Sequence, residues 1–337
     1  MAGDELPWDE LKLRSYFGRP HLVILGAGAS LAALPNGDPA GKRLPLMNNL
    51  VEVLGLTKML SDSGFDPTAN FEETYARLTA APSFEDLRLE VEERVHDYFA
   101  DLRLPQHPTI YDYLVLSLRE KDYIATFNWD PFLYRACWRH HDIAPMPQCL
   151  YLHGCSIVGY CMDHRTHGLI GTACSKCGVA FVPGPLLYPV GDKDYSSHPY
   201  IDAQWQSLRF ALKNAYVVTI FGYGAPSSDA AAIEIMTEAW GGSANRNLEE
   251  IEMINILPED ELIKTWSPLI HSHHYQVKDD YFSSLLGTFP RRSCEAMWEQ
   301  TMEANFLEYR QVPEFESLDE LRSWATEIRS HEKSVGA

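Results

Sequence analysis

Residues 21–30 read HLVILGAGAS, an apolar run that ends in a glycine-rich turn. A short apolar run bounded by glycine is typical of a buried strand, and small residues after it let a backbone approach a pyrophosphate closely. A helix that begins at such a turn also offers free N–H donors. The usual third glycine is absent, because Leu31 stands three residues after Gly28. A nucleotide-binding turn and an ordinary tight turn are therefore both open interpretations of Gly26, Ala27, Gly28, Ala29 and Ser30.

Outward from this stretch, the same pattern of an apolar run and then an amphipathic segment repeats along the chain. Strand followed by helix, several times over, is the signature of a doubly wound, mostly parallel sheet, whose ligands bind beyond the carboxyl ends of the strands. We therefore predict an α/β, Rossmann-like fold. The predicted strands are 21–25, 121–126, 148–152, 215–221 and 251–256, and the predicted helices are 130–141, 200–214, 229–240 and 260–268.

Two segments interrupt the alternation. Residues 45–120 have helical periodicity at 70–78, 84–102 and 109–119, which predicts an inserted helical layer. Residues 155–185 contain Gly, Cys, His and Pro with little periodicity, which indicates a small zinc-knuckle-like module.

The end of the chain predicts a separate helical tail. Two helices are expected after Cys294, and the second begins at Ser317-Leu318-Asp319-Glu320, which resembles a capping box. We therefore expect one main domain over residues 1–290, which includes the helical insertion and the small module, and a tail over residues 291–337.

Composition narrows the function classes. The chain has 337 residues, with 28 Lys and Arg against 47 Asp and Glu, so its formal net charge is −19. A hydrophobic content of 45% excludes wholesale disorder. Direct nucleic-acid binding is not expected, because phosphate attraction needs a basic face. No apolar run is long enough to span a membrane, and the start of the chain is acidic and amphipathic, so we expect a cytoplasmic protein.

Polar residues follow two of the predicted strands at the points where these end. Asn128 and Asp130 could hold a ribose hydroxyl or a water, but Asp130 would equally cap a helix with Pro131 in its first position. His153 ends the strand at 148–152 and could exchange a proton, since the unperturbed pKa of histidine is about 6.5. An isolated histidine is more often structural, and the neighbouring cysteines favour a functional role.

Cysteine spacing indicates a metal site. Four of the seven cysteines fall between positions 155 and 177, which favours reduced thiols or a metal over a disulfide framework. Two pairs at x2 spacing suit a tetrahedral zinc ion, because each pair presents two ligands to it. His167 or Cys155 could replace His164, and a set of reduced thiols without metal is the alternative. The predicted ligands are Cys161, His164, Cys174 and Cys177.

Two later turns add candidate cofactor contacts. Residues 221–229 (FGYGAPSSD) follow the most apolar strand and could hold phosphate or ribose, or could simply form a loop. Asn255 ends the predicted strand at 251–256, where it could meet a ribose. The histidines at 271, 273 and 274 resemble a metal cluster, but their context, HSHHYQV, favours a solvated strand.

The order of these motifs resembles the sirtuin superfamily. The GAG-x-S turn, Asn-x-Asp, His-Gly, paired zinc knuckles, the G-x-G-x-x-S-S/D turn and Ile-Asn occur in that order over about residues 20–285. The chain is more similar to divergent bacterial sirtuin-like domains than to the histone-deacylase branch. The resemblance implies that residues 27–30 lie under the NAD phosphates, that Asn128 and Asp130 meet the nicotinamide ribose, and that His153 is the catalytic base. It further implies a zinc knuckle at 161–177, cofactor contacts from Gly222, Ser227 and Ser228, and an adenosine-ribose contact from Asn255.

Several positions depart from the deacylase pattern. Phe127 and Trp129 stand where deacylases carry Gln and an aliphatic residue, and residues 185–192 lack the Phe-Gly-Glu ending that lines the acyl-lysine tunnel. The resemblance therefore implies an NAD glycohydrolase, as in bacterial effectors that deplete NAD during phage infection. Such an enzyme must be kept silent by a homo-oligomer or a partner chain, through residues 45–120 or the tail. The alternatives are an NAD-dependent protein deacylase and a non-catalytic subunit that senses NAD or ADP-ribose.

Overall fold

The computed structural model describes residues 18–164, 166–190, 193–242, 246, 248–270, 274–305 and 311–335. Its main sheet has six parallel strands in the order β3-β2-β1-β7-β8-β9, which confirms the predicted doubly wound fold. The chain adds β2 and β3 on one side of β1 and then returns to add β7 on the other. The carboxyl ends of β1 and β7 are therefore the topological switch point, where sheets of this kind bind their ligands. The strands are β1 (His21–Leu25), β2 (Tyr123–Thr126), β3 (Gln148–Tyr151), β7 (Val217–Phe221), β8 (Glu250–Ile254) and β9 (Tyr275–Lys278).

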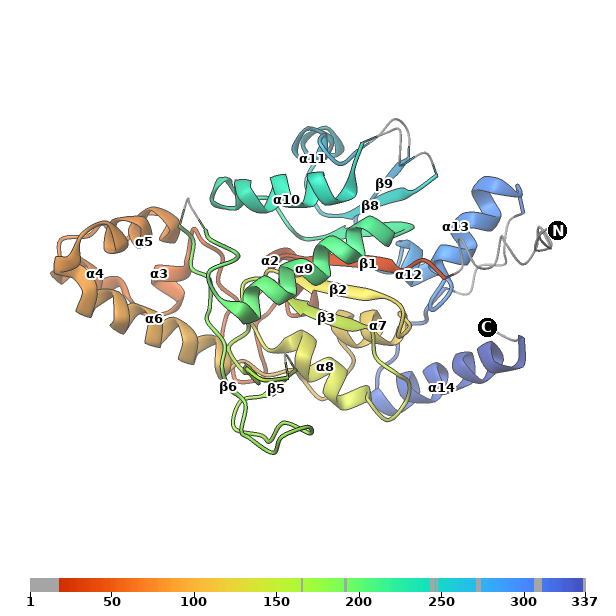
Figure 1. Cartoon of the computed structure of the whole chain (residues 1–337), viewed down its shortest axis with the longest axis horizontal. Helices are drawn as coiled ribbons and strands as arrows, with labels where there is room; N and C mark the ends of the chain where they lie inside the picture. Colours follow the sequence, from red (N-terminus) through yellow and green to blue (C-terminus); the bar gives the residue numbers. More distant parts are fainter. Residues whose placement is uncertain are drawn as a thin grey trace, which may run out of the picture.

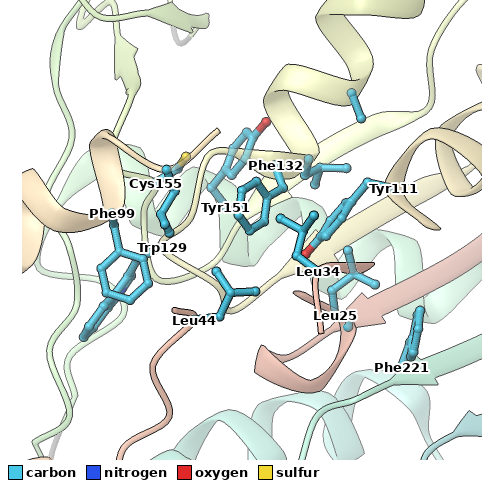
Figure 2. Close-up of a cluster of buried hydrophobic side chains, with 14 of the residues drawn as sticks. Leu25, Leu34, Leu44, Phe99, Tyr111, Trp129, Phe132, Tyr151, Cys155 and Phe221 are labelled. Carbon is cyan, nitrogen blue, oxygen red and sulfur yellow. The ribbon is translucent and has the colours of Figure 1, made fainter. Parts of the chain in front are cut away.

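Helices cover both faces of this sheet (Figure 1). Along β1, Leu22 and Ile24 pack with helices α9 and α10, whereas Val23 and Leu25 pack with α7 and α8. All four side chains are buried, as expected for a central strand of a parallel sheet. Figure 2 shows part of the core on the α7 and α8 side. The covering helices are α2 (Ala27–Ala33), α7 (Ile110–Leu116), α8 (Phe132–His140), α9 (Pro199–Asn214), α10 (Ala230–Trp240) and α11 (Glu259–Trp266).

The predicted strands and helices of this alternating part lie within two residues of the observed ones. Helix α8 begins at Phe132, because Pro131 is its N-cap and not its first residue. The single helix expected at 84–102 is a short 3-10 helix, η2 (Pro82–Phe84), followed by α6 (Glu85–Ala100). The differences are confined to element ends, where capping decides the boundary.

Between β1 and β2 the chain forms a helical layer at one end of the molecule, orange in Figure 1. Ring contacts connect this layer to residues near the sheet: Phe99 meets Trp129 edge-on at 5.5 Å, and Tyr75 stacks on Tyr188 at 4.8 Å. The layer therefore reaches the residue that follows Asn128 in sequence. It comprises α3 (Leu50–Val53), α4 (Thr57–Asp62), α5 (Phe71–Ala80), η2 and α6, while α7 packs on the sheet.

Residues 155–185 contain a second, smaller sheet that the periodicity does not predict. Strand β4 (Val158–Tyr160) pairs antiparallel with β5 (His167–Leu169) and with β6 (Val182–Pro183). Strands of two or three residues carry no detectable period, so the prediction could only identify the segment by its composition.

The C-terminal part packs on the main core. The capping box predicted at the last helix is confirmed, since Ser317 N donates to Glu320 Oε2 (3.2 Å) and Glu320 N donates to Ser317 Oγ (3.3 Å). Leu321 and Ala325 of this helix are buried in the same core as α7. The elements are α12 (Leu285–Thr288), α13 (Ser293–Met302) and α14 (Leu318–Val335), and α14 lies far from α3–α6 in Figure 1. None of the helices in the described residues has the length and apolar character that crossing a membrane requires.

Candidate functional site

Two glycine turns meet at the switch point between β1 and β7. Gly26 N donates to Phe221 O (3.0 Å), and Gly28 N donates to Gly222 O (2.9 Å). A Cβ on Gly28 would lie 2.7 Å from the Gly222 Cα, and a Cβ on Gly222 would lie 2.3 Å from Ala29 N. The two turns can therefore approach each other only with glycine at positions 28 and 222. This packing explains the two glycines whether or not a phosphate binds.

A buried hydrogen-bond network joins this turn to the residues after β2. Asn128 Nδ2 donates to Gly26 O (2.9 Å) and to Ser30 Oγ (3.0 Å), and it lies 3.3 Å from the Tyr111 hydroxyl. Ser30 Oγ donates to Asp130 Oδ2 at 2.6 Å. That bond uses the single hydroxyl proton of Ser30, so the Tyr111 hydroxyl, 2.8 Å away, donates to Ser30. The structure thus brings together Gly26, Ser30, Asn128 and Asp130 from the predicted set, with Tyr111 added from α7.

This network fixes the orientation of the Asn128 amide. The acceptors of the network, Gly26 O and the hydroxyl oxygens of Ser30 and Tyr111, all lie on the Nδ2 side. Oδ1 accepts no hydrogen bond from the described residues and is not a fully buried atom. A primary amide held by its nitrogen presents its oxygen as a fixed acceptor. Asn128 Oδ1 can therefore accept a hydrogen bond from a hydroxyl or a water that enters the site.

Asp130 belongs to the network and also accepts a hydrogen bond from the first residue of α8, but the N-cap of that helix is Pro131 and not Asp130 as the sequence suggested. Its Oδ1 accepts from Phe132 N at 3.2 Å, and its Oδ2 accepts from Ser30. Burial raises the pKa of Asp130 to about 6, and the hydrogen bonds from Ser30 and Phe132 oppose that rise. Asp130 is consequently a carboxylate at neutral pH that gains a proton in mildly acidic solution.

His153 follows β3 and belongs to a different cluster. The Phe127 ring meets the His153 ring edge-on at 4.8 Å, whereas the next residue, Asn128, bonds to Ser30. His153 Nε2 is buried, makes no hydrogen bond to any described residue, and lies 3.8 Å from Asp229 Oδ1. The pKa of His153 is lowered to about 3, mainly by burial; Asp229 opposes the shift and Lys193 adds to it. His153 is therefore a neutral imidazole at physiological pH.

Four functional candidates were not in the predicted set. Lys193 and the Tyr223 hydroxyl both donate to Asp229, Lys193 to Oδ1 and Tyr223 to Oδ2 (2.7 Å). Asp229 closes the FGYGAPSSD segment, so its position after a glycine turn was a usable signal. Lys193 lies in a segment without a motif, and Tyr111 is 81 positions from Ser30, so neither offered a local signal.

The remaining predicted cofactor residues take other contacts. Ser228 Oγ donates to Glu72 Oε1 of α5 (3.0 Å), which ties the helical layer to the turn after β7. Asn255 Oδ1 accepts from Leu257 N (3.1 Å), beyond the end of β8. Ser227 begins a 3-10 helix, η3 (Ser227–Asp229), and its side chain lies outside the described residues. Residues 271 and 273 are also outside them, and residue 274 immediately precedes β9, in agreement with the expected strand.

The four predicted zinc ligands converge in the small module. Their ligand atoms all lie within 4.8 Å of one another, with Cys161 Sγ 3.5 Å from His164 Nδ1 and 3.6 Å from Cys177 Sγ. Thiolates about 2.3 Å from a tetrahedral zinc ion would lie about 3.8 Å apart, so the set fits this metal. A hydrogen bond from Thr166 lowers the pKa of Cys174 to about 6, which favours the thiolate. Cys155 and His167, the alternatives to His164, are not members of this cluster among the described residues.

We expect the purified protein to contain close to one zinc per chain. Replacing Cys174 with serine should remove the metal, because three ligands hold zinc much less tightly than four. Cys137→Ser is the matched control, since Cys137 is a cysteine outside the cluster. Elemental analysis by mass spectrometry checks the metal content. Equal zinc in both variants would contradict the assignment.

No protein-family model matches the chain, and no curated protein matches it. Among solved structures, the chain is similar to a Sir2 homologue in complex with NAD, with 17% identity, 87% of this chain and 92% of that chain covered, and a TM-score of 0.40. It is also similar to a Sir2 homologue mutant in complex with 2′-O-acetyl ADP ribose, with 14% identity, 90% of this chain and 99% of that chain covered, and a TM-score of 0.41. A third similar structure is a Sir2 homologue mutant in complex with ADP ribose, with 15% identity, 96% of this chain and 98% of that chain covered, and a TM-score of 0.37. At identities and TM-scores this low, the function must be argued from the residues of the site.

Proposed function

We propose that this chain binds NAD at the switch point and cleaves the bond between nicotinamide and ribose, releasing nicotinamide and ADP-ribose. One observation carries the proposal: the amide of Asn128 is fixed by Gly26 and Ser30 so that its oxygen is left as an acceptor beside the two glycine turns. Asn128 and His153 follow neighbouring strands, β2 and β3, so the proposal places the ribose at the carboxyl ends of these two strands.

The proposed reaction is a hydrolysis. The C1′–N bond of the nicotinamide riboside breaks, and nicotinamide leaves with the bonding electron pair as a neutral molecule. The oxygen of a water molecule bonds to C1′, which has oxocarbenium character in the transition state. Asn128 Oδ1 orients the water or the ribose hydroxyls. His153, neutral at physiological pH, takes the proton that the water loses and then releases it to solvent.

The hydrolase is favoured over a protein deacylase by the packing of the segment that departs from the deacylase pattern. Tyr188 stacks on Tyr75 at 4.8 Å, and its ring is 5.2 Å from that of Trp129. Leu187 N donates to His153 O at 2.9 Å, which ties the same segment to the residue proposed as the base. Aromatic side chains of this protein thus line the region where deacylases carry the Phe-Gly-Glu ending of the acyl-lysine tunnel.

Incubation with and without acyl-lysine peptides tests the choice between these two activities. We expect nicotinamide release in the absence of any peptide, at a rate that acyl-peptides do not increase. Release that depends on an acyl-peptide, with the free lysine appearing in equal amount, would overturn the proposal in favour of a deacylase.

The acid side of the pH profile should report Asp130. The pH dependence of kcat/KM reports the ionisations of the free enzyme. We therefore expect kcat/KM to fall below about pH 6, because Asp130 gains a proton there and its carboxylate no longer accepts the hydrogen bond from Ser30. Ser30→Ala removes a hydrogen bond that lowers this pKa and should move the acid limb to higher pH. A limb that moves to lower pH, or that is absent in the wild type, would contradict the role of Asp130.

We further propose that the enzyme is a regulated, cytoplasmic effector that depletes NAD in bacterial defence against phage. An enzyme that destroys a central metabolite must be restrained, so we expect an oligomer or a partner chain that limits activity until a trigger arrives. Mass photometry should give particles heavier than the 38.2 kDa chain. A monomer that is fully active without any trigger would argue against this regulation.

A further inference from the structure

Lys193, Asp229, Tyr223 and His153 form a buried polar cluster on the far side of Phe127 from the Asn128 network. The side chains of His153, Lys193 and Asp229 are only 7%, 4% and 5% exposed. Lys193 Nζ and His153 Nε2 both approach the same carboxylate oxygen, Asp229 Oδ1. The lysine makes the contact, whereas the histidine stays 3.8 Å away without a partner among the described residues.

The two groups therefore compete for one acceptor. A buried donor nitrogen without a partner is unfavourable, and a carboxylate that accepts from one imidazole nitrogen makes the other a better base. If Nε2 donated to Asp229, Nδ1 would be the atom that takes the proton. In the structure, Lys193 Nζ donates to Asp229 Oδ1, which is the oxygen that His153 Nε2 would need as its acceptor.

Lys193 comes from a segment that an entering ligand would meet. A cavity of about 680 Å³ lies between α5, α6 and residues 184–190 and 193–197, and Lys193, Tyr75 and Tyr188 are among its lining residues. Lys193 thus lines a space large enough for part of a nucleotide. A phosphate that enters this cavity would attract the ammonium away from Asp229.

We propose that Asp229 is the positioning residue of His153 and that Lys193 is a latch, which occupies Asp229 at rest and leaves it when a phosphate group binds. This inference rests on the proposed function, because it explains how an NAD-cleaving enzyme would be kept slow until its substrate or a phosphate-bearing activator enters. Release of Lys193 lets Nε2–H donate to Asp229 Oδ1, and His153 becomes an effective base at Nδ1.

The groups that face His153 define the expected electrostatic change. Among the described residues, Asp229 of η3 and Lys193 are the charged groups that act on it, and the phenols Tyr195 and Tyr223 lie nearby. Removing the lysine charge leaves the carboxylate opposite the imidazole. The pKa of His153 should then rise by at least about one unit, a ten-fold gain in proton affinity.

Titration of His153 by NMR, without substrate, tests the latch directly. The resonance is assigned by its loss in His153→Gln, and Lys193→Met is compared with the wild type and with Lys213→Met, a control at an exposed lysine of α9. We expect the pKa of His153 to rise in Lys193→Met and to stay unchanged in Lys213→Met. Lys193→Gln, which can still donate a hydrogen bond to Asp229, serves if the methionine variant does not fold.

Kinetics provide the second readout. Lys193→Met should raise the basal kcat for NAD cleavage at least about ten-fold, and adding Asp229→Asn should abolish that gain. An unchanged pKa of His153 in both lysine variants would overturn the latch, as would a gain in kcat that survives Asp229→Asn. A raised pKa with no NAD cleavage by any variant would retain the latch and remove the proposed function, so the two failures are distinguishable.

Discussion

Replacing Asn128 with alanine is expected to lower the rate of NAD cleavage by at least about a hundred-fold, because a reacting group misplaced by about 1 Å loses that much. The amide is held by Gly26 O at 2.9 Å and Ser30 Oγ at 3.0 Å, so its oxygen has one orientation. Alanine removes this acceptor. It also removes one buried hydrogen bond from Gly26 O and one from Ser30 Oγ, which keep Ala29 N and Asp130 as partners, so the free energy of unfolding should fall by about 1 kcal/mol.

Two further variants separate chemistry from stability in that experiment. Asn214→Ala is the matched control, since its amide donates to Phe210 O near the end of α9 and the contact is exposed. Asn128→Asp keeps the size of the side chain but places a second carboxylate beside Asp130, so it should be inactive and less stable. Thermal unfolding of all three should accompany the rates. Turnover by a folded Asn128→Ala within about ten-fold of the wild type would contradict the role of this amide.

His153→Ala is expected to reduce kcat by about 10²–10⁴, the usual contribution of a positioned general base. His153 is neutral in the resting protein, because burial lowers its pKa to about 3, so it does not need to lose a proton before it acts. The loss should therefore have nearly the same size at pH 6 and at pH 8. A ratio of wild-type to variant kcat that does not change with pH distinguishes His153 from Asp130, whose raised pKa produces the fall in activity at acidic pH.

A histidine at the surface supplies the control for this variant. His141→Ala removes an exposed ring that stacks on Trp138, and it should leave NAD cleavage unchanged. His153→Gln retains a polar side chain that cannot take a proton in this range, so it should be as slow as the alanine variant. A loss smaller than about ten-fold in His153→Ala would show that the assigned role is wrong.

The fold was largely predictable because its signals are local. The run at 21–25 is apolar at every position after His21, and a strand covered on both faces has that pattern. Ser317 and Glu320 define a helix start over four residues, which the structure confirms. The three short strands at 158–183 escaped prediction, since each has too few residues to show a period.

The site was predictable only in part. Ser30, Asn128 and Asp130 follow strands that turned out to be neighbours, so strand order alone brings them together. Tyr111 and Lys193 join their clusters through tertiary packing, which leaves no pattern in the sequence around them. Asn255 and Ser228 make contacts to the backbone and to the helical layer in this structure, so their roles toward NAD stay predictions.

Incubation of the purified chain with NAD, beside the Asn128→Ala variant, is the most direct test of the proposed activity. Chromatography should show NAD disappearing while nicotinamide and ADP-ribose appear in equal amounts, with no acyl-peptide present, and the variant should leave NAD nearly intact. NAD that is bound by the wild-type chain but recovered unchanged, with identical traces for the two proteins, would contradict the account and would identify a nucleotide-sensing subunit.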